Sequence, residues 1–357
     1  MSEPWLRHLR IPTQPMLRHL LIASFGAGIM YLVTSNISLF DNYQVGQIAS
    51  FVVVLAGLSV LTGVNGQISL GHGAFMAVGA YTTALLMNHT QWNFVLELAS
   101  AVGVAGVAGL LIGIPATRLK GPYLAGMTLL FALALPPIAD KWPNTFGGDQ
   151  GLTMTTPNAP GSLSPQEWLA WIQIGGALIV LVLLANLLRS RYGRTLRAVR
   201  DDEIAASLAG INVARTKVLA FVISAGCAGL AGAFLGLSTG VVNTGAFPLT
   251  LSIQLLAAMV LGGTGSLIGM VWGAILLVYL PQWSTSLSGH FNLGSGVSAY
   301  LATIIFGAVL IVAMIAAPHG VQGGLRWAWR RLPGSGSGVG GPAPGAPGAP
   351  IPVLTDE

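Results

Sequence analysis

The 357-residue chain has 53% hydrophobic residues and only 8% charged residues, and its mean hydropathy is +0.73. Soluble domains carry about 25% charged residues, so this composition excludes a water-soluble globular protein. It predicts an all-α protein that crosses a membrane several times. The 16 Lys and Arg exceed the 11 Asp and Glu, but the basic residues lie between apolar segments, and we expect no nucleic-acid partner.

The chain begins with basic residues, which an apolar run at 19–38 follows. A secretory signal peptide also has this order, but its apolar run is shorter and a small-residue cleavage site follows it. The run here is long enough to span a membrane. We therefore expect residues 1–18 to be a cytoplasmic N-terminus and 19–38 to be an uncleaved first span.

The later apolar runs have about the 20 residues that a helix needs to cross the hydrocarbon core. The sequence predicts about ten membrane-spanning helices within a transmembrane domain over 19–317, at residues 19–38, 45–63, 69–88, 94–116, 121–139, 168–188, 216–239, 249–264, 267–283 and 298–317. The glycine-rich junction at 261–269 is either a full break between two helices or a re-entrant turn.

The basic residues support this number of spans, because Lys and Arg collect in cytoplasmic loops. With the N-terminus in the cytoplasm, ten spans place 15 of the 16 basic residues on that side and only Lys141 outside. The 15 residues are Arg7, Arg10, Arg18, Arg118, Lys120, Arg189, Arg191, Arg194, Arg197, Arg200, Arg215, Lys217, Arg326, Arg330 and Arg331. One span more or fewer in the middle would scatter them over both faces. We therefore predict that both termini are cytoplasmic.

Two long loops and a tail complete the predicted organisation. The outer loop 140–167 is rich in Gly, Pro and Thr, and we expect turns and a short strand there. The cytoplasmic loop 189–217 is strongly charged and is expected to be helical. Residues 318–332 form a basic cytoplasmic segment, and the Pro/Gly-rich tail 333–357 is expected to be disordered.

Ionisable side chains are scarce inside the predicted spans. His72 and Glu97 lie near span ends and Asp140 lies just past one, whereas ion-coupled carriers place carboxylates or histidines within the membrane. The six histidines are scattered, so we predict no metal site, no cofactor and no enzyme active site. The P-loop pattern GxxxxGK followed by Ser or Thr is absent, so uphill transport would need ATP hydrolysis by another subunit.

The cytoplasmic loop contains a pattern typical of a short docking helix. Asp201 or Asp202 can cap it, Ile204 and Leu208 lie four residues apart on one face, and a glycine can end it. The alanines between them have small side chains, so another protein can approach this helix closely and bind it in a groove. The alternative is a solvated loop whose arginines only set the topology. The candidate coupling residues are Arg197, Asp202, Glu203, Ala205, Ala206 and Gly210.

Residues 63–86, GVNGQISLGHGAFMAVGAYTTALL, place amides and glycines beside an apolar segment. Irregular backbone at membrane depth must be buried in protein or line a cavity. The amides either satisfy the freed backbone groups or face a polar passage, and a helix that starts near 71–73 offers N–H groups to a carboxylate. Alternatively, the small residues only allow tight helix packing, and the histidine is a structural hydrogen-bonding residue. The candidate pathway residues are Asn65, Gln67, Ser69, Gly71, His72, Gly73 and Tyr81.

This stretch resembles a known family signature. SLGHGAFMAVGAYTTALL matches SLGHxAFxxxGAYxxALL of the M-type permease of the branched-chain amino acid (Liv-type) ABC importers. Residues 191–234, which begin RYGRTLRAVRDDEIAASLAGINVARTK, are similar to the cytoplasmic loop and next helix of that family, and 251–281 to its late helices. TFGGDQGL at 145–152 resembles its outer TGGxxGL element. The resemblance spans roughly residues 40–320.

The resemblance implies a permease subunit of an ABC importer in a bacterial inner membrane, which moves branched-chain amino acids by alternating access and is not an enzyme. The implied partners are a homologous second permease, two cytoplasmic ATP-binding subunits and an extracytoplasmic substrate-binding protein. Gln254 stands where such permeases commonly have Glu, so urea or short amides are alternative solutes. An ion-coupled carrier or a channel is the alternative class. The residues implied to meet the binding protein are Gly147, Gly148, Gly151 and Leu152.

Overall fold

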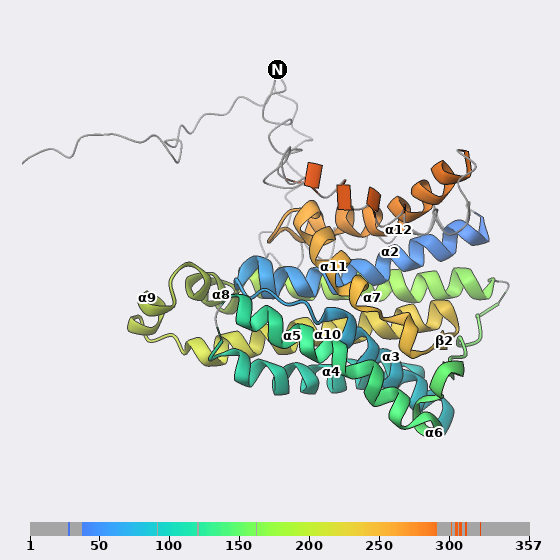
Figure 1. Ribbon diagram of the computed structural model, residues 1–357, viewed down its shortest axis with the longest axis horizontal. Helices are drawn as coiled ribbons and strands as arrows, with labels where there is room; N and C mark the ends of the chain where they lie inside the picture. Colours follow the sequence, from blue (N-terminus) through green and yellow to red (C-terminus); the bar gives the residue numbers. More distant parts are fainter. Residues whose placement is uncertain are drawn as a thin grey trace, which may run out of the picture.

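The computed structural model describes residues 38–90, 92–119, 121–161 and 163–290, with isolated positions at 28, 301, 304, 305, 307, 308, 311, 312 and 322 (Figure 1). The predicted spans 19–38 and 298–317 lie almost wholly outside these residues. Residues 1–18, the basic segment 318–332 and the tail 333–357 also lie outside them, apart from position 322. The predicted side of each terminus therefore stays a prediction.

Long α-helices dominate the described residues. The helices that correspond to predicted spans are α2 (Leu39–Leu58), α3 (His72–His89), α4 (Phe94–Ala116), α5 (Pro122–Lys141), α7 (Pro165–Arg189), α10 (Val213–Thr239), α11 (Leu249–Gly262) and α12 (Leu267–His290). A π-helical turn, η2 (Ser59–Val64), directly extends α2. By length and apolar composition, six helices of the described part can cross a membrane. The chain is thus a multi-pass helical membrane protein, and the total of ten spans stays a prediction.

Both ends of the bundle carry short elements. At one end lie α8 (Arg191–Asp201) and α9 (Glu203–Leu208), in the loop that the sequence predicts to be cytoplasmic and helical. The other end carries α6 (Pro143–Phe146), η3 (Gly148–Gln150), β1 (Leu152–Thr153), β2 (Val241–Val242) and η4 (Thr244–Ala246). Figure 1 shows α8 and α9 far from α6 and β2, across the length of the bundle.

Helix α10 lies at the centre of the described bundle and packs against α2, α3 and α4. Glycines allow the backbones to approach closely there. A Cβ atom at Gly232 would collide with the backbone of Met76 in α3, and one at Gly79 would collide with the backbone of Gly229 in α10. Since helices in lipid associate through such small-residue contacts, the glycines of α3 and α10 set the spacing of the core.

The outer loop contains the expected turns and short strand. Its strand β1 pairs antiparallel with β2, with Leu152 opposite Val242. Gly147 (φ +78°) and Gly151 (φ +71°) adopt backbone conformations that residues with side chains rarely adopt. A Cβ at Gly151 would also lie 2.5 Å from the carbonyl oxygen of Val242. The prediction of turns and a short strand is therefore confirmed.

The junction at 261–269 is a break between two helices. Helix α11 ends at Gly262 and α12 begins at Leu267, with Gly263 (φ +111°) and Gly265 (φ +78°) in the turn between them. The two helices pack against each other, and a Cβ at Gly262 would collide with the backbone of Gly269. The helix is therefore interrupted here, and whether the turn between α11 and α12 is re-entrant stays a prediction.

Candidate functional site

The connection between α2 and α3, residues 59–73, is called the α2–α3 junction here. It starts with the π-helical turn η2, and the backbone N–H groups of Asn65, Gly66 and Gln67 return to carbonyls of η2 at 3.1, 3.2 and 3.1 Å. The Thr62 hydroxyl donates to the Gln67 carbonyl at 2.9 Å. The predicted break in the helix is therefore real, and local hydrogen bonds satisfy much of its backbone.

His72 is the first residue of α3 and is almost completely buried. Its Nδ1 lies 3.1 Å from the Ser69 hydroxyl, and its Nε2 lies 2.7 Å from the hydroxyl of Ser224 in α10. Both ring nitrogens therefore have a hydrogen-bond partner. This geometry is that of a structural residue that ties the start of α3 to α10.

The residues that lead into α3 and its first turn also contact α5 and α11. The N–H group of Leu70 donates to the Thr128 hydroxyl of α5 at 3.0 Å, and that of Gly73 donates to the Ser252 hydroxyl of α11 at 2.9 Å. A Cβ at Gly71 would lie 2.5 Å from the Thr128 carbonyl oxygen. Because these contacts already use N–H groups that a carboxylate would need, the structure favours a packing role for Gly71 and Gly73.

Asn65 and Gln67 differ from their neighbours. Their side chains are buried, at 3% and 4% exposure, yet neither the amide nitrogen nor the amide oxygen of either has a hydrogen-bond partner among the described residues. Each unsatisfied buried group costs about 1–3 kcal/mol. Packing alone does not explain two such side chains in one short segment.

Tyr81 lies nine residues beyond His72, which along an α-helix is about 13 Å. Its buried hydroxyl has no partner in the described part of the chain, and its ring packs edge-on against Phe146 of α6. It lines a cavity of about 10 Å³ together with Pro136 of α5 and Asn243, which precedes η4. The structure thus separates Tyr81 from the other candidate pathway residues and places it near the outer elements.

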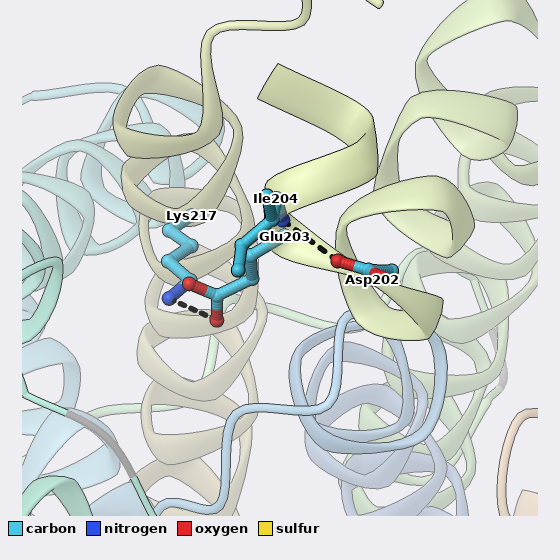
Figure 2. A network of polar contacts seen from close by, with 4 residues as sticks. All are labelled: Asp202, Glu203, Ile204 and Lys217. Carbon is cyan, nitrogen blue, oxygen red and sulfur yellow. Dashed lines mark hydrogen bonds and ion pairs between the residues drawn. The ribbon is translucent and has the colours of Figure 1, made fainter. Parts of the chain in front are cut away.

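At the opposite end, α9 forms as the sequence predicts. The Asp202 carboxylate accepts from the N–H groups of Ile204 and Ala205 at 2.8 and 3.1 Å, as Figure 2 shows for Ile204. Gly210 (φ +81°) ends the helix, because its N–H bonds to the Ser207 carbonyl in a Schellman arrangement. Local hydrogen bonds therefore define both ends of this six-residue helix.

An ion pair attaches α9 to the membrane-spanning α10. The Lys217 ammonium group lies 2.6 Å from a carboxylate oxygen of Glu203 (Figure 2), and Lys217 is only 4% exposed. A buried ammonium needs such a partner, since it is costly to bury alone. Glu203 therefore connects α9 to the first turns of α10.

The other candidate coupling residues have different surroundings. Ile204 and Leu208 are exposed at 71% and 84%, and Ala205 is also exposed, whereas Ala206 is 4% exposed and faces the permease itself. The guanidinium group of Arg197 donates to the Leu188 carbonyl of α7 at 3.1 Å. The outward surface of α9 is thus apolar, and Ala206 is not part of it.

Comparison with known proteins agrees with this geometry. The model of a family described as "Branched-chain amino acid transport system / permease component" matches residues 43–314. The chain belongs to this family. It is 32% identical over 296 residues to the branched-chain amino acid permease protein LivM of Escherichia coli (strain K12), which covers 76% of this chain and 67% of LivM.

A second set of relatives places the chain within the family. LivH of Escherichia coli (strain K12) is 27% identical over 299 residues, which covers 77% of this chain and 92% of LivH. Because the identity to LivM is higher, the predicted M-type assignment is confirmed. Homologous permeases and six apolar helices indicate a multi-pass protein of the bacterial inner membrane.

One solved structure, PsaBC from Streptococcus pneumoniae in complex with Fab, is 16% identical to this chain. The match covers 85% of this chain and 99% of that chain, with a TM-score of 0.43. This similarity is too weak to support an argument.

Sequence patterns alone do not identify several partners of this permease's α2–α3 junction. Ser224, Ser252 and Thr128 contact the start of α3 across 58 to 179 residues of sequence. In the sequence, each is only a hydroxyl residue within a largely apolar segment. The structure shows that all three are buried. Arg200, which contacts Gly63, lies among several arginines that the pattern cannot separate.

Proposed function

We propose that this permease subunit moves a branched-chain amino acid across the membrane by alternating access, with ATP hydrolysed on two cytoplasmic partner subunits. Its membership of the branched-chain amino acid permease family supports this proposal. The sequence has no P-loop of its own. The structural observation that carries the proposal is α9, which presents an apolar surface outside the apolar spans.

The α9 surface is suited to a protein groove. Ile204 and Leu208 lie one turn apart, and both are largely exposed. A short helix with an apolar pair at i and i+4 matches the pattern by which helices dock into grooves. Since Glu203 of the same helix is paired with Lys217 of α10, a displacement of α9 by an ATPase subunit would pass directly to a membrane-spanning helix.

The proposed pathway passes the α2–α3 junction. The unpartnered amides of Asn65 and Gln67 can hydrogen-bond either the ammonium or the carboxylate group of an amino acid. Tyr81 supplies a further polar group toward the outer end. Urea or a short amide fits the same groups, so the solute is a matter for measurement.

The remaining parts of the proposal concern partners. A homologous permease of the LivH kind would form the second half of the pathway, because the chain is similar to both LivM and LivH proteins. The outer turn at Gly147, Gly148, Gly151 and Leu152 would receive the substrate-binding protein. Its glycines also have a structural role, since they allow the tight turn that leads into β1.

The test uses the permease co-expressed with the ATPases, second permease and binding protein of neighbouring genes. We expect Ile204→Asp and Leu208→Asp to reduce the ATPase that co-purifies with the permease by about ten-fold, because a charge replaces an apolar anchor in the interface. Ser207→Ala is the matched control, since this exposed hydroxyl donates to the Ile204 carbonyl within α9 itself. Unchanged co-purification in both Asp variants would refute the docking role.

Uptake measurements separate the alternative functions. Leucine, isoleucine, valine, urea and acetamide are offered to the complete complex with its binding protein, with and without ATP. We expect ATP-dependent uptake of the three amino acids. Uptake into vesicles that contain this chain alone, driven by an ion gradient, would instead support an ion-coupled carrier.

A further inference from the structure

The α8–α9 loop contacts the α2–α3 junction directly. Arg200 is the penultimate residue of α8, and its Nη1 donates a hydrogen bond of 2.6 Å to the carbonyl oxygen of Gly63 in η2. Carbonyl groups in the last turn of a helix lack an intrahelical partner, and a guanidinium donor makes a strong, charge-assisted bond to such an oxygen. The loop therefore supplies a hydrogen bond that the end of α2 cannot make for itself.

Two glycines at this contact resist replacement, one because of its backbone conformation and one because of a close backbone neighbour. A Cβ at Gly66 would lie 3.1 Å from Cγ of Arg200, and Gly66 has a φ of +77°. A Cβ at Gly63 would lie 2.5 Å from the backbone nitrogen of Gly265, in the turn between α11 and α12. The end of α2 is thus held between α8 on one side and the α11–α12 turn on another.

The segment held in this way has features of a structure with two states. π-Helical turns are rare in proteins and are frequent at functional sites. The buried amides of Asn65 and Gln67, which follow η2 directly, have no partner among the described residues, so burial costs free energy that hydration would recover. A shift of the junction that brings these amides to water is therefore favoured once its restraints are released.

We propose that Arg200 is a positioning residue that couples the α8–α9 loop to the pathway through its bond to Gly63. While the bond is present, η2 is held in place and the amides of Asn65 and Gln67 stay buried. When α8 and α9 move with the ATPase subunits, the bond breaks and the amides turn toward the pathway. This inference rests on the proposed function, because it assumes that an ATPase subunit moves α9.

Thiol labelling of the assembled complex tests the proposal. Cys227, the single cysteine of the chain, is replaced by Ala, and Gln67→Cys serves as the reporter for a membrane-permeant maleimide. With Arg200 present, we expect slow labelling in one nucleotide state and fast labelling in the other, comparing nucleotide-free complex with complex trapped by ATP and vanadate. In Arg200→Gln, we expect fast labelling in both states, roughly ten-fold above the slow rate, because a hydrogen bond to a charged group is lost.

The matched control is Arg194→Gln, which removes the same charge from an exposed position of the same helix. We expect it to keep the difference between the nucleotide states. Arg200→Lys retains a cationic donor, so it is expected to restore part of that difference, which a change of packing alone would not do.

A second measurement does not depend on the reporter cysteine. Leucine imported per ATP hydrolysed is expected to fall about ten-fold in Arg200→Gln and to recover partly in Arg200→Lys, at equal amounts of assembled complex. If the Arg200→Gln and Arg194→Gln variants have the same labelling rates and import the same amount of leucine per ATP hydrolysed, the inference is overturned. If Arg200→Gln does not assemble, the leucine-to-ATP ratio of Arg200→Lys decides, and a ratio equal to that of the unmodified complex counts against it. Failure of the unmodified permease to bind any ATPase would instead refute the proposed function.

Discussion

His72 is a buried polar residue with a clear structural role at the scale of single side chains. It bridges Ser69 and Ser224, whose side chains are themselves buried. Asn65 and Gln67 differ from His72, because their side chains are also buried but have no hydrogen-bond partner among the described residues. The junction therefore combines a satisfied polar anchor with an unsatisfied polar segment.

We expect His72→Ala to destabilise the permease by about 3 kcal/mol, because it creates a cavity and removes the His72 partner of the buried Ser224 hydroxyl. The thermal unfolding midpoint of the purified complex in detergent measures this effect. His89→Ala is the matched control at the other end of α3, since His89 is exposed and, among the described residues, hydrogen-bonds to the Leu85 carbonyl of its own helix. Equal midpoints for the two variants would contradict the assignment of His72 as an anchor.

Long-range contacts mark the limit of sequence analysis at this scale. The helix cap at Asp202 and the end of α9 at Gly210 were predictable, because capping depends on residues only a few positions apart. The bond from Arg200 to Gly63 joins residues 137 positions apart. No local pattern distinguishes Arg200 from the other arginines of α8, so this part of the site required the fold.

Helix α9 depends strongly on local hydrogen bonds, because it has only six residues. Short helices are marginal without capping. Asp202 supplies two hydrogen bonds at its start and therefore controls whether the apolar pair of α9 is presented in helical geometry.

A substitution series at Asp202 tests this dependence. Asp202→Asn keeps a good N-cap, whereas Asp202→Ala costs about 1 kcal/mol of helix stability. We expect the Ala variant to retain roughly five-fold less ATPase on co-purification, and the Asn variant to behave like the unmodified permease. If the Asn and Ala variants lose ATPase equally, the carboxylate charge matters and the cap does not.

Helix boundaries show how burial inside protein differs from burial in lipid. The span predicted at 45–63 begins earlier, with α2 at Leu39 and a cap at Ser38. The extra turn contains Asn42 and Gln44, which lower its hydropathy, yet both are buried. Gln44 donates to Gln282 of α12 at 2.9 Å, a contact between residues 238 positions apart that hydropathy cannot reveal.

At the scale of the whole molecule, the distribution of charge predicts which end faces the cytoplasm. The Lys and Arg residues of α8, of the start of α10 and of the end of α7 gather at one end of the bundle, and Lys141 ends α5 at the other (Figure 1). Such segregation is typical of the positive-inside rule. The sequence therefore predicted where the described spans lie along the chain, whereas the end that faces the cytoplasm stays a prediction.

Cysteine accessibility tests this topology. In a Cys227→Ala background, Asn158→Cys lies in the loop predicted to be outside and Ser207→Cys lies in α9. A membrane-impermeant thiol reagent applied to intact cells is expected to label position 158 and not 207, and inverted vesicles should give the reverse. Labelling of both positions from the same side would require a different number of spans between them.

The glycine contacts of α10 have a mechanical consequence. Where Gly232 meets Met76 and Gly229 meets Gly79, backbone lies against backbone, without flexible side chains between them that could absorb sliding. We therefore expect α3, α4 and α10 to behave as one rigid body. Helix α5 meets this body closely at Thr128, whose carbonyl lies against Gly71, but it buries few of its other residues. We therefore expect the displacement that alternating access requires to be concentrated between α5 and the rigid body, with Thr128 as its pivot.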